Sequence, residues 1–199
     1  MKLNALETLV VNNPLRARWQ ARVLQGLLVL HPPRRGGVVL EIGCGRGEGA
    51  FQLIPRLRPA HYLALDLDPA MLARARRRLA RAGLLPRASL LLADSTRLPL
   101  PPASVDLVFG FGFLHHVPRW QAALAEVARV LRPGGAYYLE EFYPACYANP
   151  LTRRLLVHPR ENRFQSPDLF RELGRAGFRL AGARDRPWWG VTAAVVKED

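Results

Sequence analysis

The chain has 199 residues, of which 49% are hydrophobic and 23% are charged, proportions typical of a folded globular protein rather than a disordered one. Its net charge is +13, and its two cysteines, Cys44 and Cys146, are too few for a disulfide framework. No apolar run approaches the roughly 20 residues that a bilayer-spanning helix needs, and no signal peptide is recognisable. We therefore expect one soluble domain over residues 1–199, located in the cytoplasm.

The excess of positive charge comes almost entirely from arginine, because Lys2 and Lys197 are the only lysines. Such charge fits an acidic partner, such as nucleic acid or an anionic lipid surface. A general bias in residue usage, with arginine on solvated faces, explains it as well. We favour this bias because no long basic tail and no interleaving of basic and aromatic residues stands out.

The first predicted element is an amphipathic helix over residues 14–30. Pro14 suits the first turn of a helix, and apolar residues from Trp19 to Leu30 recur at three- to four-residue spacing. We expect a lid or packing helix, because its apolar stripe suits a core. The alternative is a peripheral membrane contact, in which this basic, tryptophan-bearing helix lies on anionic lipid.

From residue 38 onward, short apolar runs alternate with longer amphipathic segments. Asp68–Pro69, Pro118 and Ser166–Pro167 indicate helix starts, because proline fits the first turn and polar caps precede it. The expected strands cover residues 38–42, 62–67, 88–92, 105–110, 136–142, 178–184 and 191–196. The expected helices cover residues 48–57, 69–83, 118–131 and 166–177, with a turn at 132–135. This alternation predicts an α/β fold with an open, mostly parallel sheet and helices on both faces.

Ligands of such sheets bind at the carboxyl ends of the strands, and a glycine-rich segment follows the first strand directly. Residues 41–49 read Glu-Ile-Gly-Cys-Gly-Arg-Gly-Glu-Gly. The dinucleotide-binding pattern GxGxxG needs a glycine where this chain has Glu48. An acidic residue at the helix start disfavours a pyrophosphate and is better tolerated by a cationic ligand. A tight turn that holds no ligand is the alternative.

Acidic residues follow the next two strands. Asp66 ends the second strand, where a carboxylate can accept hydrogen bonds from both hydroxyls of a ribose. Asp68 is better explained as a helix cap. The pair Asp94–Ser95 follows the third strand and could contact the amino group of an adenine, or it could form an ordinary turn.

Two histidines follow the fourth strand, in the segment 109–116 that reads Phe-Gly-Phe-Gly-Phe-Leu-His-His. His115 and His116 could line a reaction pocket, although we expect at least one of them to pack structurally. A zinc site would need further ligands, and the chain has few cysteines and histidines, so we expect no metal.

The order of these features resembles the class I S-adenosylmethionine-dependent methyltransferases, and within them the small-molecule branch that includes the ubiquinone/menaquinone-biosynthesis type. The motifs that carry the resemblance lie over residues 38–142, and the C-terminal segment resembles the family's last helix and strand hairpin. They read VLEIGCGRGEG, ALDLDPAML, ADSTRLPLPPASVDLVFGFGFLHHV and ALAEVARVLRPGG. The resemblance implies a Rossmann-like, doubly wound, seven-stranded sheet whose last strand is antiparallel. It also implies S-adenosylmethionine as cofactor and S-adenosylhomocysteine as product.

The resemblance assigns the methionine part of the cofactor to the glycine loop, with Glu41 as its support. It assigns the ribose hydroxyls to Asp66, the adenine to Leu67 and the pair 94–95, and the neighbourhood of the sulfonium to Phe111. The expected cofactor-binding residues are Glu41, Gly43, Cys44, Gly45, Gly47, Asp66, Leu67, Asp94, Ser95 and Phe111.

The implied reaction is an in-line transfer of a methyl group to a nucleophile, which needs a base where the nucleophile carries a proton. The candidate catalytic residues are His115, His116, Glu141 and Tyr143, which follow the fourth and fifth strands. Packing or pocket lining is the alternative for each of them. Glu140 and Glu141 are neighbours in a strand, so only one of them is expected to face the site.

The acceptor is expected to be small or lipid-like. The Asn/Asp–Pro–Pro–aromatic motif of adenine- and amide-modifying relatives is absent, and Ala145 precedes Cys146 where cytosine-C5 enzymes have proline. Two alternatives remain: a nucleic-acid methyltransferase, and a non-catalytic membrane-surface or binding protein that retains the fold.

We divide the domain into a helical lid or cap (1–35), a cofactor-binding core (36–142), an acceptor-side insertion (143–165) and a C-terminal helix with a strand hairpin (166–199). The insertion is rich in basic residues, which could contact an anionic acceptor or simply be exposed. They are Arg153, Arg154, His158, Arg160 and Arg163.

Overall fold

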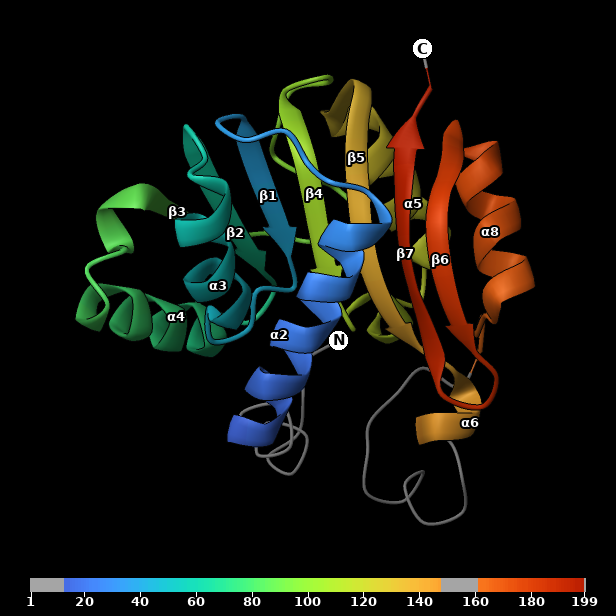
Figure 1. Cartoon of the computed structure of the whole chain (residues 1–199), viewed down its shortest axis with the longest axis horizontal. Coiled ribbons are helices and arrows are strands. Elements are labelled where there is room, and N and C mark those ends of the chain that lie inside the picture. Colours follow the sequence, from blue (N-terminus) through green and yellow to red (C-terminus); the bar gives the residue numbers. More distant parts are fainter. Residues whose placement is uncertain (1–12, 148–160, 199) are drawn as a thin grey trace.

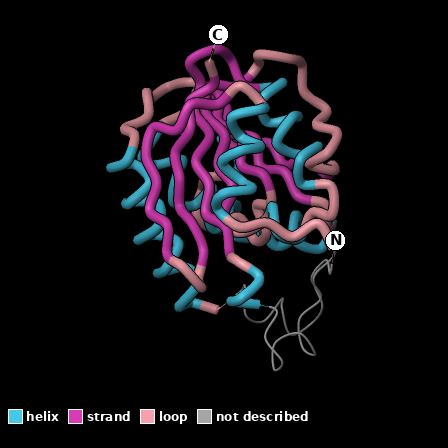
Figure 2. Tube along the Cα trace, turned by 90° about the vertical axis from the view of Figure 1, so that its right-hand side faces the viewer, coloured by secondary structure: helices cyan, strands magenta, loops and turns pink. Residues whose placement is uncertain are grey.

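The computed structural model describes residues 13–147 and 161–198, which form a sheet with helices on both faces (Figures 1 and 2). The strands are β1 (Val38–Ile42), β2 (His61–Asp66), β3 (Ala88–Leu92), β4 (Val105–Phe111), β5 (Leu131–Phe142), β6 (Phe178–Arg186) and β7 (Gly190–Lys197). The α-helices are α2 (Pro14–Leu30), α3 (Glu48–Leu57), α4 (Pro69–Arg81), α5 (Trp120–Val130), α6 (Pro144–Tyr147) and α8 (Ser166–Arg175). Two 3-10 turns are η1 (Leu85–Arg87) and η2 (Leu114–His116).

The sheet has seven strands in the order β3-β2-β1-β4-β5-β7-β6. Neighbours from β3 to β5 pair in parallel, whereas β7 runs antiparallel to both β5 and β6. This confirms the predicted fold class, including the antiparallel last strand. The carboxyl ends of β1 and β4 therefore lie at the same edge of the sheet, the lower end in Figure 1.

The largest difference from the predicted boundaries is at the fifth strand, whereas other predicted ends differ by at most two residues. Residues 132–135 were expected to form a turn before a strand that starts at 136, but β5 starts at Leu131. In the structure Val105 lies opposite Leu131 and Leu107 lies opposite Ala136, so the register shifts between these pairs and residues 132–135 lie within the shift. The extra residues on β5 are accommodated as a bulge, in which Pro133 and the glycines fit without breaking the strand.

Helix starts follow the cap residues. The Asp68 carboxylate accepts a hydrogen bond from the Ala70 N–H at 2.8 Å, which agrees with its interpretation as a cap. Asn13 caps α2 in the same way, through the Leu15 N–H at 2.8 Å. Capping satisfies backbone donors that the first helical turn leaves without partners.

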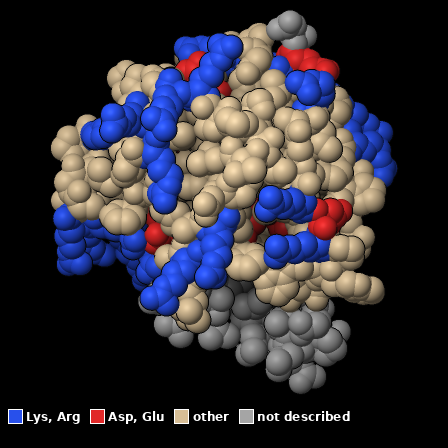
Figure 3. Space-filling model, in the orientation of Figure 1, with Lys and Arg blue, Asp and Glu red and all other residues tan. Residues whose placement is uncertain are grey.

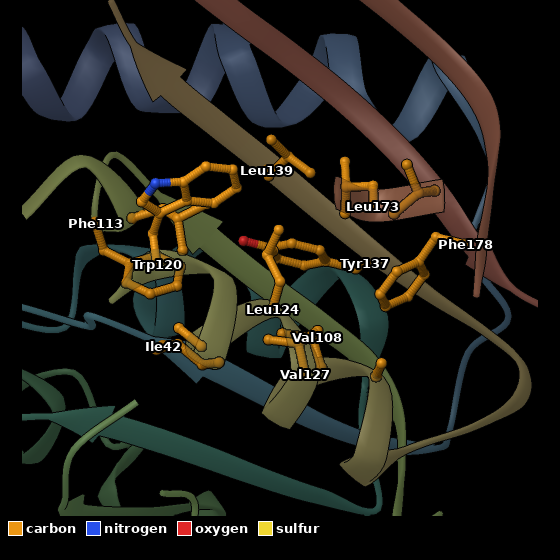
Figure 4. Close-up of a cluster of buried hydrophobic side chains, with 14 of the residues drawn as sticks. Ile42, Val108, Phe113, Trp120, Leu124, Val127, Tyr137, Leu139, Leu173 and Phe178 are labelled. Carbon is orange, nitrogen blue, oxygen red and sulfur yellow. The ribbon is translucent and has the colours of Figure 1, made fainter. Parts of the chain in front are cut away.

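The two faces of the sheet carry two hydrophobic clusters. One joins the sheet to α5 and α8, and Figure 4 shows its centre around Tyr137, Trp120 and Leu124. The other joins the sheet to α2, α3 and α4. In α2 the buried apolar side chains are Val23, Leu24 and Leu27, so the apolar stripe of this helix packs on the sheet. Across residues 13–147 and 161–198, no helix is long and apolar enough to span a bilayer.

Candidate cofactor-binding site

A cavity of about 250 Å³ lies at the carboxyl ends of β1, β2, β3 and β4. The loops that follow these strands build its wall, as expected for an open parallel sheet. The predicted residues on this wall are Gly43, Gly45, Asp66, Leu67, Asp94, Ser95, Phe111 and His116. Gly43 and His116, which are 73 residues apart in sequence, thus line the same cavity.

The glycine loop after β1 adopts left-handed backbone conformations, with φ of +70° at Gly43, +53° at Gly45 and +78° at Gly47. A Cβ at Gly45 would meet no atom within 4 Å, so its backbone is open to a ligand. A Cβ at Gly47 would lie 3.2 Å from Ala75 Cβ of α4, so this glycine permits close packing of the loop on that helix. Cys44 is buried, and burial raises the pKa of its thiol.

Replacing Gly43 with alanine is expected to destabilise the fold and to weaken cofactor binding. The new Cβ would lie 2.6 Å from Phe113 Cβ, and Phe113 lines the cavity. The left-handed conformation costs about 1–2 kcal/mol for a non-glycine residue, and overpacking adds about 1–3 kcal/mol. Urea denaturation measures the sum.

The matched control is Gly83→Ala at the end of α4. Gly83 has a φ of +67°, and a Cβ there would meet no atom within 4 Å. This variant should show the conformational cost alone and bind cofactor normally. Equal losses of stability in the two variants would contradict the predicted contact with Phe113.

Asp66 joins two of the loops that surround the cavity. One carboxylate oxygen accepts the Gly45 N–H at 2.8 Å, and the other accepts the Asp68 N–H at 2.9 Å. Burial raises the pKa of this carboxyl group. A carboxylate has about four lone-pair positions, so two remain for donors such as the hydroxyls of a ribose.

Asp94 forms a local turn and also lines the cavity. Its carboxylate accepts hydrogen bonds from the Thr96 N–H at 2.8 Å and from the Thr96 hydroxyl at 2.9 Å. The hydrogen bond from the backbone of Thr96 is the main reason why the pKa of Asp94 is lowered. The turn-forming and ligand-facing interpretations of Asp94–Ser95 are therefore compatible.

Glu41 does not line the cavity but lies beneath the glycine loop. Its buried carboxylate accepts the Tyr62 hydroxyl at 2.7 Å and packs against Gly49 at the start of α3. Burial raises the pKa of Glu41 from 4.5 to about 8. This position suits a support for the loop.

Glu41 makes the stability of the fold depend on pH. Because its pKa is raised on folding, the stability that its proton contributes is fully present below pH 4.5 and is lost as the pH rises through about 8. Each pKa unit corresponds to about 1.4 kcal/mol, so the loss between these limits is several kcal/mol. Urea denaturation across this range should show that loss in the wild type and a much smaller loss in Glu41→Gln. Parallel curves for the two proteins would contradict the prediction.

Of the four candidate catalytic residues, His116 lines the cavity. Glu141 is buried, and its carboxylate accepts backbone N–H groups of Phe113, Leu114 and His115, together with the His115 ring at 2.7 Å. His115 and Glu141 therefore join η2 to β5 behind the cavity wall.

Tyr143 lies elsewhere, where its hydroxyl contacts Ser166 and donates to Asp185 at 2.6 Å. Glu140 and Glu141 point in opposite directions, as expected for neighbours in a strand. Neither lines the main cavity: Glu140 accepts the Trp19 indole N–H at 2.6 Å and pairs with Arg16 at 2.6 Å. This pair of contacts anchors α2 to β5.

Sequence reasoning did not single out several residues of the cavity wall. Most are apolar residues that lie within the motif segments, close in sequence to the residues that were singled out, and this closeness was the available signal. They are Ile42, Leu65, Met71, Thr96, Gly112, Phe113, Val117, Pro118 and Arg119. Of the basic residues proposed for an acceptor, Arg153, Arg154, His158 and Arg160 lie outside the described residues, and Arg163 is exposed.

The chemistry of the wall fits S-adenosylmethionine. Asp66 and Asp94 favour a cationic ligand, and the open lone pairs of Asp66 suit a diol. Leu67, Met71 and Val117 offer apolar surface for a flat ring. Within the described part of the chain, no group of three or more His, Cys, Asp and Glu side chains could hold a metal ion.

Comparison with known proteins supports this interpretation. Residues 39–135 match the family described as a methyltransferase domain. The chain is 41% identical over 109 residues to the fatty-acid O-methyltransferase of Mycolicibacterium smegmatis, covering 55% of this chain and 38% of that protein. It is 37% identical over 110 residues to the phthiotriol/phenolphthiotriol dimycocerosates methyltransferase of Mycobacterium leprae, covering 55% and 39%. The chain thus spans well under half the length of these curated relatives.

The fold is shared over nearly the whole chain with the crystal structure of a SAM-dependent methyltransferase from Aquifex aeolicus. The TM-score is 0.77 at 18% identity, covering 98% of this chain and 99% of that one. Residues 39–135 are therefore similar to a methyltransferase domain, and the chain shares its fold with a SAM-dependent methyltransferase.

Proposed function

We propose that the chain transfers a methyl group from S-adenosylmethionine to a small, lipid-like acceptor. The observation that carries the proposal is Asp66, held by the Gly45 and Asp68 N–H groups at the cavity wall with acceptor positions to spare. The lipid-like acceptor is supported by the names of the two curated relatives, a fatty-acid and a phthiotriol dimycocerosates methyltransferase.

In this proposal the protein contributes binding, alignment and exclusion of water. Asp66 holds the ribose, and Leu67 and Met71 cover the adenine. When bound, the cofactor supplies an electrophilic methyl group on a sulfonium. Alignment of the acceptor with that methyl group can lower the barrier by up to roughly 7–11 kcal/mol. Phe111 and Phe113 form the apolar wall beside the reacting centre.

His116 is the candidate catalytic base. It lines the cavity after β4, and its ring lies 4.3 Å from the ring of His115, between centroids. His115 is in turn held by Glu141 at 2.7 Å. A neutral imidazole in this position could accept a proton from a hydroxyl acceptor, whereas a carboxylate acceptor would need no base.

The test is methyl transfer from cofactor labelled in the methyl group. The purified chain is incubated with a long-chain fatty acid, with a long-chain lipid alcohol and with RNA, and the label is counted in each extracted product. Label in a lipid product, absent for Asp66→Asn and present for Asp106→Asn at the other end of β4, would support the proposal. Label in no lipid product, although the cofactor binds, would overturn the lipid-like acceptor.

One observation favours RNA as the second candidate acceptor. Four arginines lie on one face of α4: Arg74, Arg77, Arg78 and Arg81. Together with Arg46 they surround an open hollow. Figure 3 shows basic side chains at this corner. Glu48 pairs with Arg78 at 2.7 Å and offsets part of the charge. Label in RNA that falls steeply as salt rises would favour this candidate.

A further inference from the structure

The turn between β6 and β7 exposes two tryptophans. Trp188 is 82% exposed and Trp189 is 47% exposed. Trp188 has a φ of +75°, a conformation that is unusual for a bulky residue and costs the fold stability. In Figure 1 this turn lies beside α6, at the same end of the molecule as the carboxyl ends of β1 and β4.

Arginines surround these indoles. Arg22 of α2 and Arg184 and Arg186 of β6 line a hollow of about 210 Å³ together with Trp19 and Trp189. We call these five residues and Trp188 the Trp–Arg surface.

The contacts within this surface leave its positive charge exposed. The Arg186 guanidinium lies 5.7 Å from the centroid of the Trp19 ring, and the Trp19 and Trp189 centroids are 6.1 Å apart. Glu140 and Glu141 also line the hollow, but both are buried, and Glu140 pairs with Arg16. Asp185, the acidic neighbour in β6, accepts the Tyr143 hydroxyl. Figure 3 shows basic side chains spread over this face, with acidic ones beside some of them.

We propose that the Trp–Arg surface docks on bilayers that contain anionic lipid. Tryptophan prefers the boundary between headgroups and hydrocarbon, because its ring is apolar and its N–H is polar. Arginine binds lipid phosphates through a planar set of donors. Docking at this turn would place the cavity edge of the molecule toward the bilayer. It is independent of methyl transfer. It shares Trp19 with the apolar stripe of α2 but not Val23, Leu24 and Leu27, which are buried.

The charges argue against two other occupants. In a symmetric contact between two copies, Arg22, Arg184 and Arg186 of one copy would face the same residues of the other. Single-stranded nucleic acid binds most often in basic grooves with stacked aromatic platforms, whereas Trp188 lies on the tip of a turn.

The experiment is co-sedimentation with vesicles of phosphatidylcholine, with and without phosphatidylglycerol. The wild type should bind the phosphatidylglycerol vesicles and lose binding as salt rises. Arg186→Ser should weaken binding about fivefold, the effect of one basic residue near an anionic surface. Trp188→Asn should weaken it at least as much, and asparagine tolerates the left-handed backbone, so the turn stays folded.

The matched controls lie on the same strand at its other end. Arg179 and Leu180 are exposed there, roughly 20–25 Å along β6 from Arg186 at about 3.3 Å per residue. Arg179→Ser and Leu180→Ala should bind vesicles within about twofold of the wild type. A second readout is quenching of tryptophan fluorescence by brominated phosphatidylglycerol, which should fall in Trp188→Phe.

Five results would overturn the proposal. The wild type could bind neither vesicle, or both equally. The control variants could lose as much binding as the turn variants. Trp188→Asn could instead abolish a dimer in sedimentation velocity, which would assign the surface to a second copy. Stronger binding of a single-stranded oligonucleotide than of vesicles, lost in the same variants, would assign it to nucleic acid.

Discussion

Replacing Asp66 with asparagine is expected to weaken S-adenosylmethionine binding at least about 100-fold. Hydrogen bonds to a charged group contribute about 1.5–3 kcal/mol each. The amide replaces one carboxylate oxygen with a donor and leaves the other uncharged, so one bond to the ribose is lost and the other is weakened. The loss is larger than that of the bonds alone, because the carboxylate also holds the Gly45 and Asp68 N–H groups. In the asparagine variant the amide NH₂ would face one of these two N–H groups, and that N–H would then have no acceptor.

The matched control for this change is Asp106→Asn. Asp106 lies at the opposite end of β4 from the cavity, where it accepts the Val38 N–H at 2.7 Å and pairs with Arg132. Calorimetric titration should show near-normal binding for this variant and almost none for Asp66→Asn. Equal affinities for the two would remove Asp66 from the proposed ribose site.

Replacing Glu141 with alanine is expected to lower the free energy of unfolding by about 3–5 kcal/mol, the range seen when a buried charge network loses one partner. Its carboxylate is the acceptor for the backbone N–H groups of Phe113, Leu114 and His115, at 2.9 to 3.2 Å, and for the His115 ring. Without the Glu141 carboxylate these buried N–H groups have no acceptor. Each unsatisfied donor lowers the free energy of unfolding by about 1–3 kcal/mol. Cofactor binding should fall too, because Phe113 lines the cavity.

Glu141→Gln separates this structural role from a catalytic one. The amide keeps the shape of the side chain but places a donor among donors, so stability should fall measurably, as read from urea denaturation. A variant that is as stable as the wild type, binds cofactor normally and has lost methyl transfer would contradict the structural role. Such a result would restore Glu141 as a candidate base.

The sheet and part of the cavity wall could be predicted because their signals are local. Each strand is a short apolar run, and Asp66 and the glycine loop directly follow such runs. In a parallel sheet these ends must meet, whatever the contacts between side chains. Gly45 and Asp66 are therefore brought together by topology, although they are 21 residues apart.

The roles of the buried polar residues could not be predicted in the same way. Glu141 is defined by backbone N–H groups 26 to 28 residues before it, and every residue except proline carries such a group. Tyr143 depends on Ser166 and Asp185, which β6 and α8 bring to it from later in the chain. Position after a strand makes a residue a candidate for a site, but the direction of its side chain decides whether it reaches the cavity.

The most direct test of this account is calorimetric titration of the wild-type chain with S-adenosylmethionine and S-adenosylhomocysteine, with NAD as the control. The account predicts that both sulfur-containing ligands bind at one site per chain and that NAD does not bind. Glu48 stands where the dinucleotide pattern needs glycine, which is why NAD should be excluded. Absence of binding for both sulfur-containing ligands, or equal binding of NAD, would contradict the assignment of the cavity to this cofactor.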